Sequence, residues 1–396
     1  MPALRTLAAA ALRAQPNRVF GFDLLRAAAI LITVYGHAAL LLPPGLRSWH
    51  NLPASAIDGV NIFFVLSGYL IGGILLRGLL HERKPFSLLH FWMRRWLRTL
   101  PAYLLVLGVA VAVAAGQHRL PAGVGRYFVF GQNLTSVHPA FFPEGWSLAV
   151  EEWFYLLFPV SVLLGAALVR HRRWAFAGAI GLLLVLPPLF KLYEYRQGLG
   201  LSPATWDAVY RRIVAARLDA IALGVLGCYV QHYHAGLWRW LRRPGLLAAG
   251  ALLGITLLYP KLGPGVLFYN IWFRPLLECL AVLLVLPYAA QLRVARATGL
   301  TRGITLISLI SYSMYLLNKS ILIKLVLLPL LHAVLTPALG AAGWPVAYAL
   351  YWGLLLSGAL LLYSYVEVPF MNLRAAFEKP APAPTPPAGP YAPAGR

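Results

Sequence analysis

The sequence predicts an all-α protein, a polytopic membrane helix bundle with about ten transmembrane helices and both termini in the cytoplasm. Of the 396 residues, 60% are hydrophobic and only 12% are charged, and the mean hydropathy is +0.70. These charges are too few to cover the surface of a soluble protein of this length. Apolar runs of the length that crosses a hydrocarbon core recur along the whole chain.

Ten apolar segments predict the membrane spans. They are 22–42, 57–80, 99–115, 146–169, 174–190, 213–232, 244–259, 267–290, 304–331 and 345–366. We expect one transmembrane domain over 21–373, preceded by a cytoplasmic segment, 1–20. Residues 374–396 are rich in Pro and Ala with nothing to bury, which predicts a disordered cytoplasmic tail.

The net charge of +22 indicates how the chain is oriented. With the N-terminus inside and the spans alternating, most lysines and arginines fall in inner segments, as is typical of cytoplasmic loops. We therefore expect a multi-pass protein of the cell membrane, whose basic loops suit anionic lipid or a phosphorylated ligand. In a soluble protein this charge would suggest nucleic acid, but no such motif is present and we expect no nucleic-acid partner.

The two cysteines, Cys228 and Cys279, lie in apolar runs and have no metal-binding spacing. We expect both to be small buried hydrophobic residues. His232 and His234 lie at a predicted helix end, where a metal role is not favoured. We predict no metal site and no permanently bound cofactor.

The first span contains an arginine, Arg26, and a histidine, His37. Eleven residues are about three helical turns, so both side chains share one face, about 16 Å apart. Titratable groups in a bilayer are expensive and usually functional. The predicted topology puts Arg26 near the cytoplasmic end and His37 in the outer half. His37 is a candidate for proton transfer, and a structural histidine is the alternative.

The second span carries glycines and a few polar residues. Small residues allow helices to approach closely, and we expect this of Gly59, Gly68, Gly72 and Gly73. Asp58, Asn61 and Ser67 are candidate substrate-binding residues. The alternative for Asp58 is a solvated position at the membrane interface.

Three arginines precede the third span in FWMRRWLRTLPAYLL. Arg95 and Arg98 are three residues apart and lie on one helical face, and Arg94 adjoins them. Guanidinium groups suit bidentate phosphate binding, so this cluster predicts a phosphate clamp. The alternative is simple anchoring at the cytoplasmic surface.

The fourth span begins with EGWSLAVEEWFYLLFP, in which Glu151 and Glu152 lie just inside the apolar segment. Adjacent carboxylates at this depth indicate function. One can stabilise a charged imidazole while the other pairs elsewhere, since successive helical residues point about 100° apart. Trp146, Trp153 and Tyr155 fit an interfacial aromatic belt, and Trp146 and Tyr155 are also candidate substrate contacts.

Later spans add further charged residues. Arg217 and Asp219, in RLDAIALG, are candidate substrate-binding residues, and so is Lys319, which we expect to face the bundle interior. Arg274 and Glu278 are four residues apart and predict an ion pair within one helix.

Together these segments resemble the integral-membrane acyltransferase family 3, which includes O-antigen and exopolysaccharide O-acetylases and macrolide acyltransferases. The resemblance covers about residues 20 to 373. It rests on seven motifs in order: Arg26-x10-His37, GVNIFFVLSGYLI, RRWLRTLPAY, WSLAVEEWFYLLFP, RLDAIALG, SYSMYLLNK and VEVPF.

The resemblance implies ten helices and transfer of an acyl group, usually acetyl from cytoplasmic acetyl-CoA, to a hydroxyl of a carbohydrate-type acceptor. Polysaccharide, lipopolysaccharide, peptidoglycan and glycolipid are all compatible acceptors. By the same resemblance His37 is the catalytic histidine, and Arg26 is the helix-1 arginine. Arg95 and Arg98 match the family's RxxR pair, and Glu151 matches the carboxylate of its WSL-x-VE motif.

Two positions depart from the family. Asn61 stands where Asp is frequent, and Asn318 stands where His is frequent. Asparagine forms hydrogen bonds but does not titrate near neutral pH. We expect both residues to orient groups or bind substrate.

The expected mechanism follows from these positions. The acyl-CoA phosphates would dock on Arg94, Arg95 and Arg98, and the thioester arm would reach past Arg26. His37 would act as general base with Glu151 stabilising its charged form, or would carry the acyl group itself. The rival interpretation is a proton-coupled transporter that uses the same titratable residues, although we find no internal repeat.

Overall fold

The computed structural model describes residues 18–51, 57–80, 86–262, 265–294 and 298–373. Most of the predicted N-terminal segment, 1–20, and the predicted tail, 374–396, lie outside the described residues, so both remain predictions. The described chain is helical and contains no strand, which confirms the all-α prediction.

The longer α-helices follow the predicted spans closely. They are α2 (Phe20–Ala38), α4 (Gly59–Leu80), α5 (Leu88–Gly116), α6 (Gly145–Leu168), α7 (Arg172–Arg196), α8 (Leu218–Tyr233), α10 (Pro244–Leu262), α12 (Arg274–Ala289), α13 (Gly299–Leu317) and α16 (Gly343–Leu362). The helix predicted at 213–232 begins later, at Leu218, and the helix predicted at 99–115 begins earlier, at Leu88, so that it includes the arginine cluster.

Short helical segments connect the long ones. The α-helical segments are α3 (Pro44–Asn51), α9 (Ala235–Trp240), α11 (Val266–Phe268), α14 (Leu328–Leu330), α15 (Thr336–Leu339) and α17 (Val368–Asn372). The 3₁₀ turns are η1 (Ala39–Leu41), η3 (Val124–Val129), η5 (Val214–Ala216) and η9 (Gly340–Ala342). The π-helical turns are η4 (Asp207–Arg211), η6 (Tyr269–Phe273), η7 (Asn318–Leu327), η8 (Leu331–Leu335) and η10 (Tyr363–Glu367).

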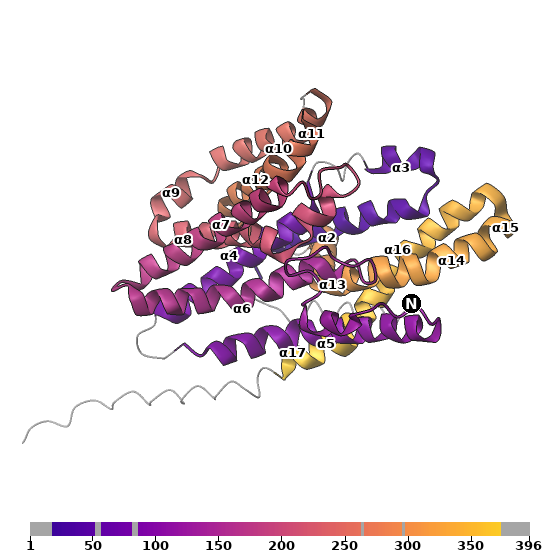
Figure 1. Cartoon of the computed structure of the whole chain (residues 1–396), viewed down its shortest axis with the longest axis horizontal. Coiled ribbons are helices and arrows are strands. Elements are labelled where there is room, and N and C mark those ends of the chain that lie inside the picture. Colours follow the sequence, from indigo (N-terminus) through magenta and orange to yellow (C-terminus); the bar gives the residue numbers. More distant parts are fainter. Residues whose placement is uncertain (1–17, 52–56, 81–85, 263–264, 295–297, 374–396) are drawn as a thin grey trace, which may run out of the picture.

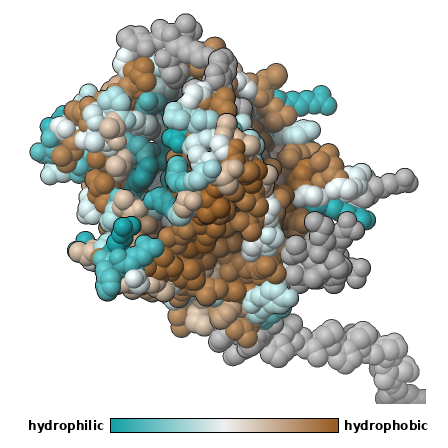
Figure 2. Space-filling view, turned by 90° about the vertical axis from the view of Figure 1, so that its right-hand side faces the viewer, coloured by the Kyte–Doolittle hydropathy of each residue, from teal (hydrophilic) through white to brown (hydrophobic). Residues whose placement is uncertain are grey.

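Seven helical runs of the described chain are long and apolar enough to span a membrane. The last of them, Gly299–Asn372, bends back at Gly340, whose φ of +57° favours glycine, and α13 then packs beside α16. On α7, exposed hydrophobic residues recur with helical spacing at Leu182, Val185, Leu186 and Leu189. Such an outward apolar stripe is suited to lipid, and Figure 2 shows hydrophobic side chains over much of one end of the bundle. The chain is therefore a multi-pass membrane protein.

Helix α4 lies at the centre of the bundle and packs against α2, α8 and α12 (Figure 1). Its closest approach is to α8, where a Cβ on Gly68 would lie 1.9 Å from the carbonyl oxygen of Ile221. Reciprocally, a Cβ on Gly224 would lie 1.9 Å from that of Val65. A Cβ on Gly59 would meet Ala29 of α2. The predicted role in close helix packing is confirmed for Gly59 and Gly68.

Both cysteines are buried, as predicted, with Cys228 5% exposed and Cys279 fully enclosed.

A buried polar contact ties the start of α2 to α13. Asp23 accepts a hydrogen bond from Ser308 Oγ at 2.8 Å and pairs with Arg18. These contacts fix α2, which carries Arg26 and His37, against the rest of the bundle.

Candidate functional site

Two adjoining cavities in the bundle contain most of the predicted site residues. We name the first the His37 cavity, with a volume of about 310 Å³, and the second the Arg95 cavity, with a volume of about 370 Å³. Val60 and Tyr315 line both, so the cavities meet at these side chains. Helix α2 runs along both, since Arg26 lines one and His37 the other.

The ring of His37 is held by Asn318. Its Nδ1 lies 2.6 Å from Asn318 Oδ1. The amide of Asn318 is oriented by its own Nδ2, which donates to the carbonyl oxygens of Tyr315 at 2.5 Å and Met314 at 3.3 Å. The amide oxygen facing His37 can only accept, so Nδ1 carries the proton and Nε2 is left free to accept one.

The local helix geometry explains how Asn318 reaches the histidine. Asn318 is fully buried and is the first residue of η7, where the α-helical pattern of α13 widens into a π-helix. Such wide turns are frequent at functional sites. Here the residue that begins the wide turn meets a histidine 281 positions earlier in the sequence.

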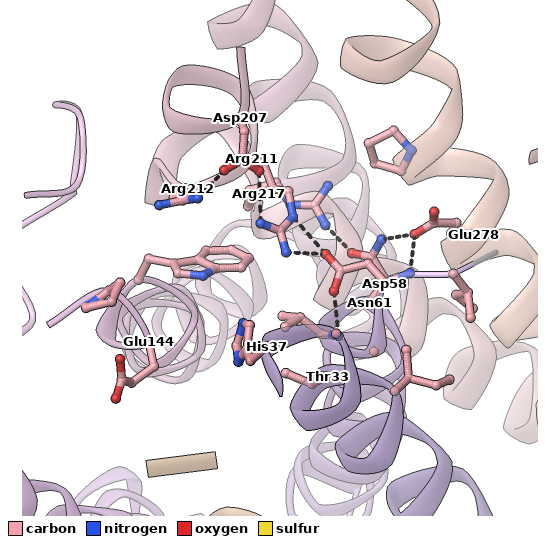
Figure 3. Close-up of a pocket in the computed structure, with 18 of the residues that line it drawn as sticks. Thr33, His37, Asp58, Asn61, Glu144, Asp207, Arg211, Arg212, Arg217 and Glu278 are labelled. Carbon is pink, nitrogen blue, oxygen red and sulfur yellow. Dashed lines mark hydrogen bonds and ion pairs between the residues drawn. The ribbon is translucent and has the colours of Figure 1, made fainter. Parts of the chain in front are cut away.

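A chain of ion pairs forms another wall of the His37 cavity (Figure 3). Asp58 contacts Arg211 through Nε at 2.7 Å and Nη2 at 2.6 Å. Asp207 accepts from Arg211 Nη1 at 2.9 Å and also pairs with Arg212. Burial by itself raises the pKa of Asp58 and of Asp207, but the neighbouring arginines hold both pKa values below their usual range. Both carboxylates therefore stay ionised.

Glu278 links the remaining polar groups of this wall. Its Oε1 accepts from Arg274 Nε at 2.8 Å, which confirms the predicted pair within one helix. Its Oε2 accepts from Asn61 Nδ2 at 2.6 Å and from the backbone N–H of Asp58 at 3.0 Å. The amide oxygen of Asn61 accepts from Arg217. Asn61 thus orients charged groups rather than titrating.

The Arg95 cavity combines cationic and apolar walls. The arginines that line it are Arg26, Arg77, Arg95 and Arg98. Apolar side chains of α4 form much of the remainder, among them Phe63, Leu66, Leu70, Ile71 and Ile74. Such a cavity suits an anionic ligand with a flexible, largely apolar arm. Arg95 and Arg98 share the predicted helical face.

Glu151 belongs to the Arg95 cavity and does not contact His37. Its carboxylate accepts from Ser67 Oγ at 3.2 Å and from Tyr155 Oη at 2.8 Å. The guanidinium carbon of Arg95 lies 4.1 Å from the centre of the Tyr155 ring. Within the described structure His37 forms a hydrogen bond with Asn318, whereas the sequence predicts Glu151 as its partner.

Five predicted site residues fall outside the lining of both cavities in the described chain: Arg94, Glu152, Tyr155, Asp219 and Asn318. Arg94 is exposed on α5. Glu152 is buried and accepts from Thr99 Oγ1 at 3.0 Å. Asp219 pairs with Lys191 at 3.0 Å. Glu152, Tyr155 and Asp219 therefore pair with side chains inside the bundle.

The aromatic-belt interpretation is wrong for Trp146 and Tyr155, which are only 5% and 1% exposed and so do not face lipid. Trp146 lines the His37 cavity, and the centre of its ring lies 4.8 Å from the guanidinium carbon of Arg211. Trp146 therefore stays a predicted substrate contact, whereas Tyr155 donates a hydrogen bond to Glu151.

Several cavity residues were not predicted from the sequence: Glu144, Asp207, Arg211, Arg212 and, as a cavity residue, Glu278. One signal pointed to the two arginines. They are adjacent cations in a segment that the charge pattern assigns to the outer side, against the usual bias. These two cations have local carboxylate partners: Arg211 pairs with Asp58, and Arg212 pairs with Asp207.

Comparison with known proteins adds to this geometry. A sequence model of the acyltransferase 3 family, described as an acyltransferase domain, matches residues 19–364. The chain is 30% identical over 176 residues to the peptidoglycan O-acetyltransferase OatA of Listeria monocytogenes, covering 40% of this chain and 26% of that protein. It is 32% identical over 163 residues to the O-acetyltransferase OatA of Staphylococcus aureus, covering 37% and 25%. The chain thus spans under a third of the length of these relatives. No solved structure matches it.

Proposed function

This chain belongs to the acyltransferase 3 family, and we propose from that premise that it is a membrane O-acyltransferase acting on a hydroxyl group of a glycan. Acetyl is the acyl group we favour, because the relatives are named as O-acetyltransferases. Peptidoglycan, named for one of them, is the first acceptor to test. Surface polysaccharide, lipopolysaccharide and glycolipid are the further candidates.

The observation that supports the proposal is that one helix places His37 in the first and Arg26 in the second of two adjoining cavities of different character. We assign the acyl donor to the Arg95 cavity and the acceptor to the His37 cavity. Acyl-CoA is the donor we propose, since its phosphates would pair with guanidinium groups and its flexible arm would lie along the apolar wall. Arg26, Arg95 and Arg98 are the arginines we assign to it.

In the proposed reaction, Nε2 of His37 takes the proton of the acceptor hydroxyl as its oxygen attacks the thioester carbonyl. Nδ1 of the resulting imidazolium donates to Asn318 Oδ1, which stabilises the positive charge. The tetrahedral intermediate then breaks its C–S bond, and the departing thiolate takes the proton from His37. The products are the O-acyl glycan and free thiol. General-base catalysis of this kind contributes about 10²–10⁴-fold in rate.

A second route within the same class forms an acyl-histidine on Nε2 before the acceptor reacts. It would give ping-pong kinetics, whereas direct transfer requires both substrates to be bound together. The geometry of His37 suits both routes, because each uses the same free nitrogen.

The test compares two variants at equal membrane abundance, with labelled acetyl-CoA as donor and extracted glycan as acceptor. We expect His37→Ala to lose about 10²–10⁴-fold in transfer. Trp174→Phe is the matched control, since Trp174 is 54% exposed and lies on α7 away from both cavities. Full transfer by the His37→Ala protein would overturn the assignment of this residue.

A further inference from the structure

The charges that line the His37 cavity are unequal in number. Its cationic residues are Arg211, Arg212, Arg217, Arg274 and Lys319. Its acidic residues are Asp58, Glu144, Asp207 and Glu278. Three of the acids are taken by three of the arginines: Asp58 and Asp207 by Arg211 and Arg212, and Glu278 by Arg274. Two cations, Arg217 and Lys319, are left without an ion-pair partner among the described residues.

The fourth acid, Glu144, is held elsewhere. Its carboxylate accepts from the backbone N–H of Ser320 at 3.0 Å and from Ser320 Oγ at 2.7 Å. In Figure 3 it points away from the three labelled arginines. Glu144 attracts Lys319 electrostatically, but within the described chain the two do not come within ion-pairing distance. Lys319 also makes no hydrogen bond in that part of the chain.

Arg217, which also lines the cavity, supports the same conclusion. It is 1% exposed, its charged end bonds only to the neutral amide of Asn61, and its buried Nε has no hydrogen-bond partner among the described residues. A buried guanidinium without an anion is costly, and an anion supplied by a ligand would offset that cost.

We propose that the His37 cavity recognises an anionic group, a carboxylate or a phosphate, carried by the glycan acceptor, and that Lys319 is the residue that binds it. The proposal rests on the function proposed above and names the class of acceptor. Lys319 directly follows Asn318, the residue that holds His37. An anion bound to Lys319 would therefore place a hydroxyl of the same sugar unit beside the histidine, while Arg217 supplies positive potential to the cavity.

The experiment measures equilibrium binding to the full-length protein in lipid nanodiscs, without acyl donor. The first pair of probes is a disaccharide of N-acetylglucosamine and N-acetylmuramic acid, which carries one carboxylate, and its neutral carboxamide. The second pair is N-acetylglucosamine 1-phosphate and N-acetylglucosamine. We expect the wild-type protein to bind one anionic probe roughly tenfold to a hundredfold more tightly than its neutral partner, as is typical of a charge-assisted hydrogen bond. The pair that shows the preference identifies the anion.

Variants at two lysines test which residue produces the preference for the anionic probe. Lys319→Gln should remove the preference and leave binding of the neutral probe within about twofold, whereas Lys319→Arg should keep it. Lys324→Gln is the matched control, because Lys324 lies in the same segment, η7, but is exposed, donates to the carbonyl oxygen of Ala140 and does not line the cavity.

Equal binding of charged and neutral probes by the wild-type protein would overturn the proposal without the use of any variant. So would an equal loss of both probes in Lys319→Gln, since that result indicates a general structural role. Because binding is read without transfer, a protein that prefers the anion yet transfers no acetyl group counts against the proposed function and leaves the acceptor class intact.

Discussion

The two cavities differ in how their charges are arranged. In the His37 cavity, three of the four acids are locked to arginines, and the polar wall is a connected network that runs from Asp207 to Glu278. In the Arg95 cavity, four arginines meet a single lining acid, Glu151, and the remaining wall is largely apolar. The same helices, α2 and α4, contribute to both.

The difference indicates that the two cavities suit different kinds of substrate. A wall of paired charges is preorganised and presents hydrogen-bonding groups without large reorganisation, which suits a polar sugar held in one orientation. A wall of arginines with few acids attracts a polyanion and leaves room for an apolar arm. The difference supports the proposed assignment of the sugar to one cavity and the acyl carrier to the other, and the predictions below test that assignment.

The largest expected effect is on α4, one of the two helices that line both cavities. Gly68→Ala would place a methyl group 1.9 Å from the carbonyl oxygen of Ile221, so α4 and α8 must separate. Overpacking against backbone costs about 3 kcal/mol, and we expect a lower midpoint of thermal unfolding in detergent together with loss of both donor and acceptor binding.

Gly108→Ala on α5 is the control for that prediction, because a methyl group there meets nothing within 4 Å. We expect this variant to change stability by less than about 1 kcal/mol, in the stabilising direction, since alanine favours a helix. An equal loss in both variants would show that the close α4–α8 contact is not responsible.

The next prediction tests whether Asn318, rather than the expected Glu151, is the residue that controls the protonation of His37. Asn318→Leu removes the oxygen that fixes the proton on Nδ1, so kcat should fall roughly tenfold to a hundredfold, and Asn318→Asp should retain more activity because it keeps an acceptor. The measurement is kcat against pH. A merely structural asparagine would lower kcat without changing the shape of the pH profile.

Glu151→Gln sharpens the same contrast. Glu151 lies in the Arg95 cavity beside Ser67 and Tyr155, so we expect its neutral variant to change KM for the donor by a few-fold and to leave the pH dependence of kcat unchanged. If instead Glu151→Gln altered the pH profile as Asn318→Leu should, the carboxylate would act on His37 after all.

Much of the bundle was predictable because membrane spans carry strong local signals. Apolar length indicated the helices, and glycines indicated that the second span packs closely against a neighbour, without naming α8. Helical spacing put Arg95 and Arg98 on one face. Each of these signals is contained within one segment of the sequence.

The partners of the site residues were less predictable, because helical periodicity gives the face of a residue but not the helix that it meets. The contact between His37 and Asn318 depends on a π-helical turn far along the chain. Likewise, Arg211 reaches Asp58 from a loop whose path no periodic pattern describes. Glu151 has the chemistry of an imidazole partner, yet its place on α6 turns it to the neighbouring cavity.

The most direct test of placing the acyl donor in the Arg95 cavity is donor binding, measured apart from transfer with a non-hydrolysable thioether analogue of acetyl-CoA. We predict that His37→Ala protein binds it as wild type does, that Arg98→Gln binds it at least about tenfold more weakly, and that Arg94→Gln, altered at an exposed residue outside the cavity, is little changed. Weakened binding in His37→Ala with normal binding in Arg98→Gln would contradict the account, because the donor would then lie in the His37 cavity.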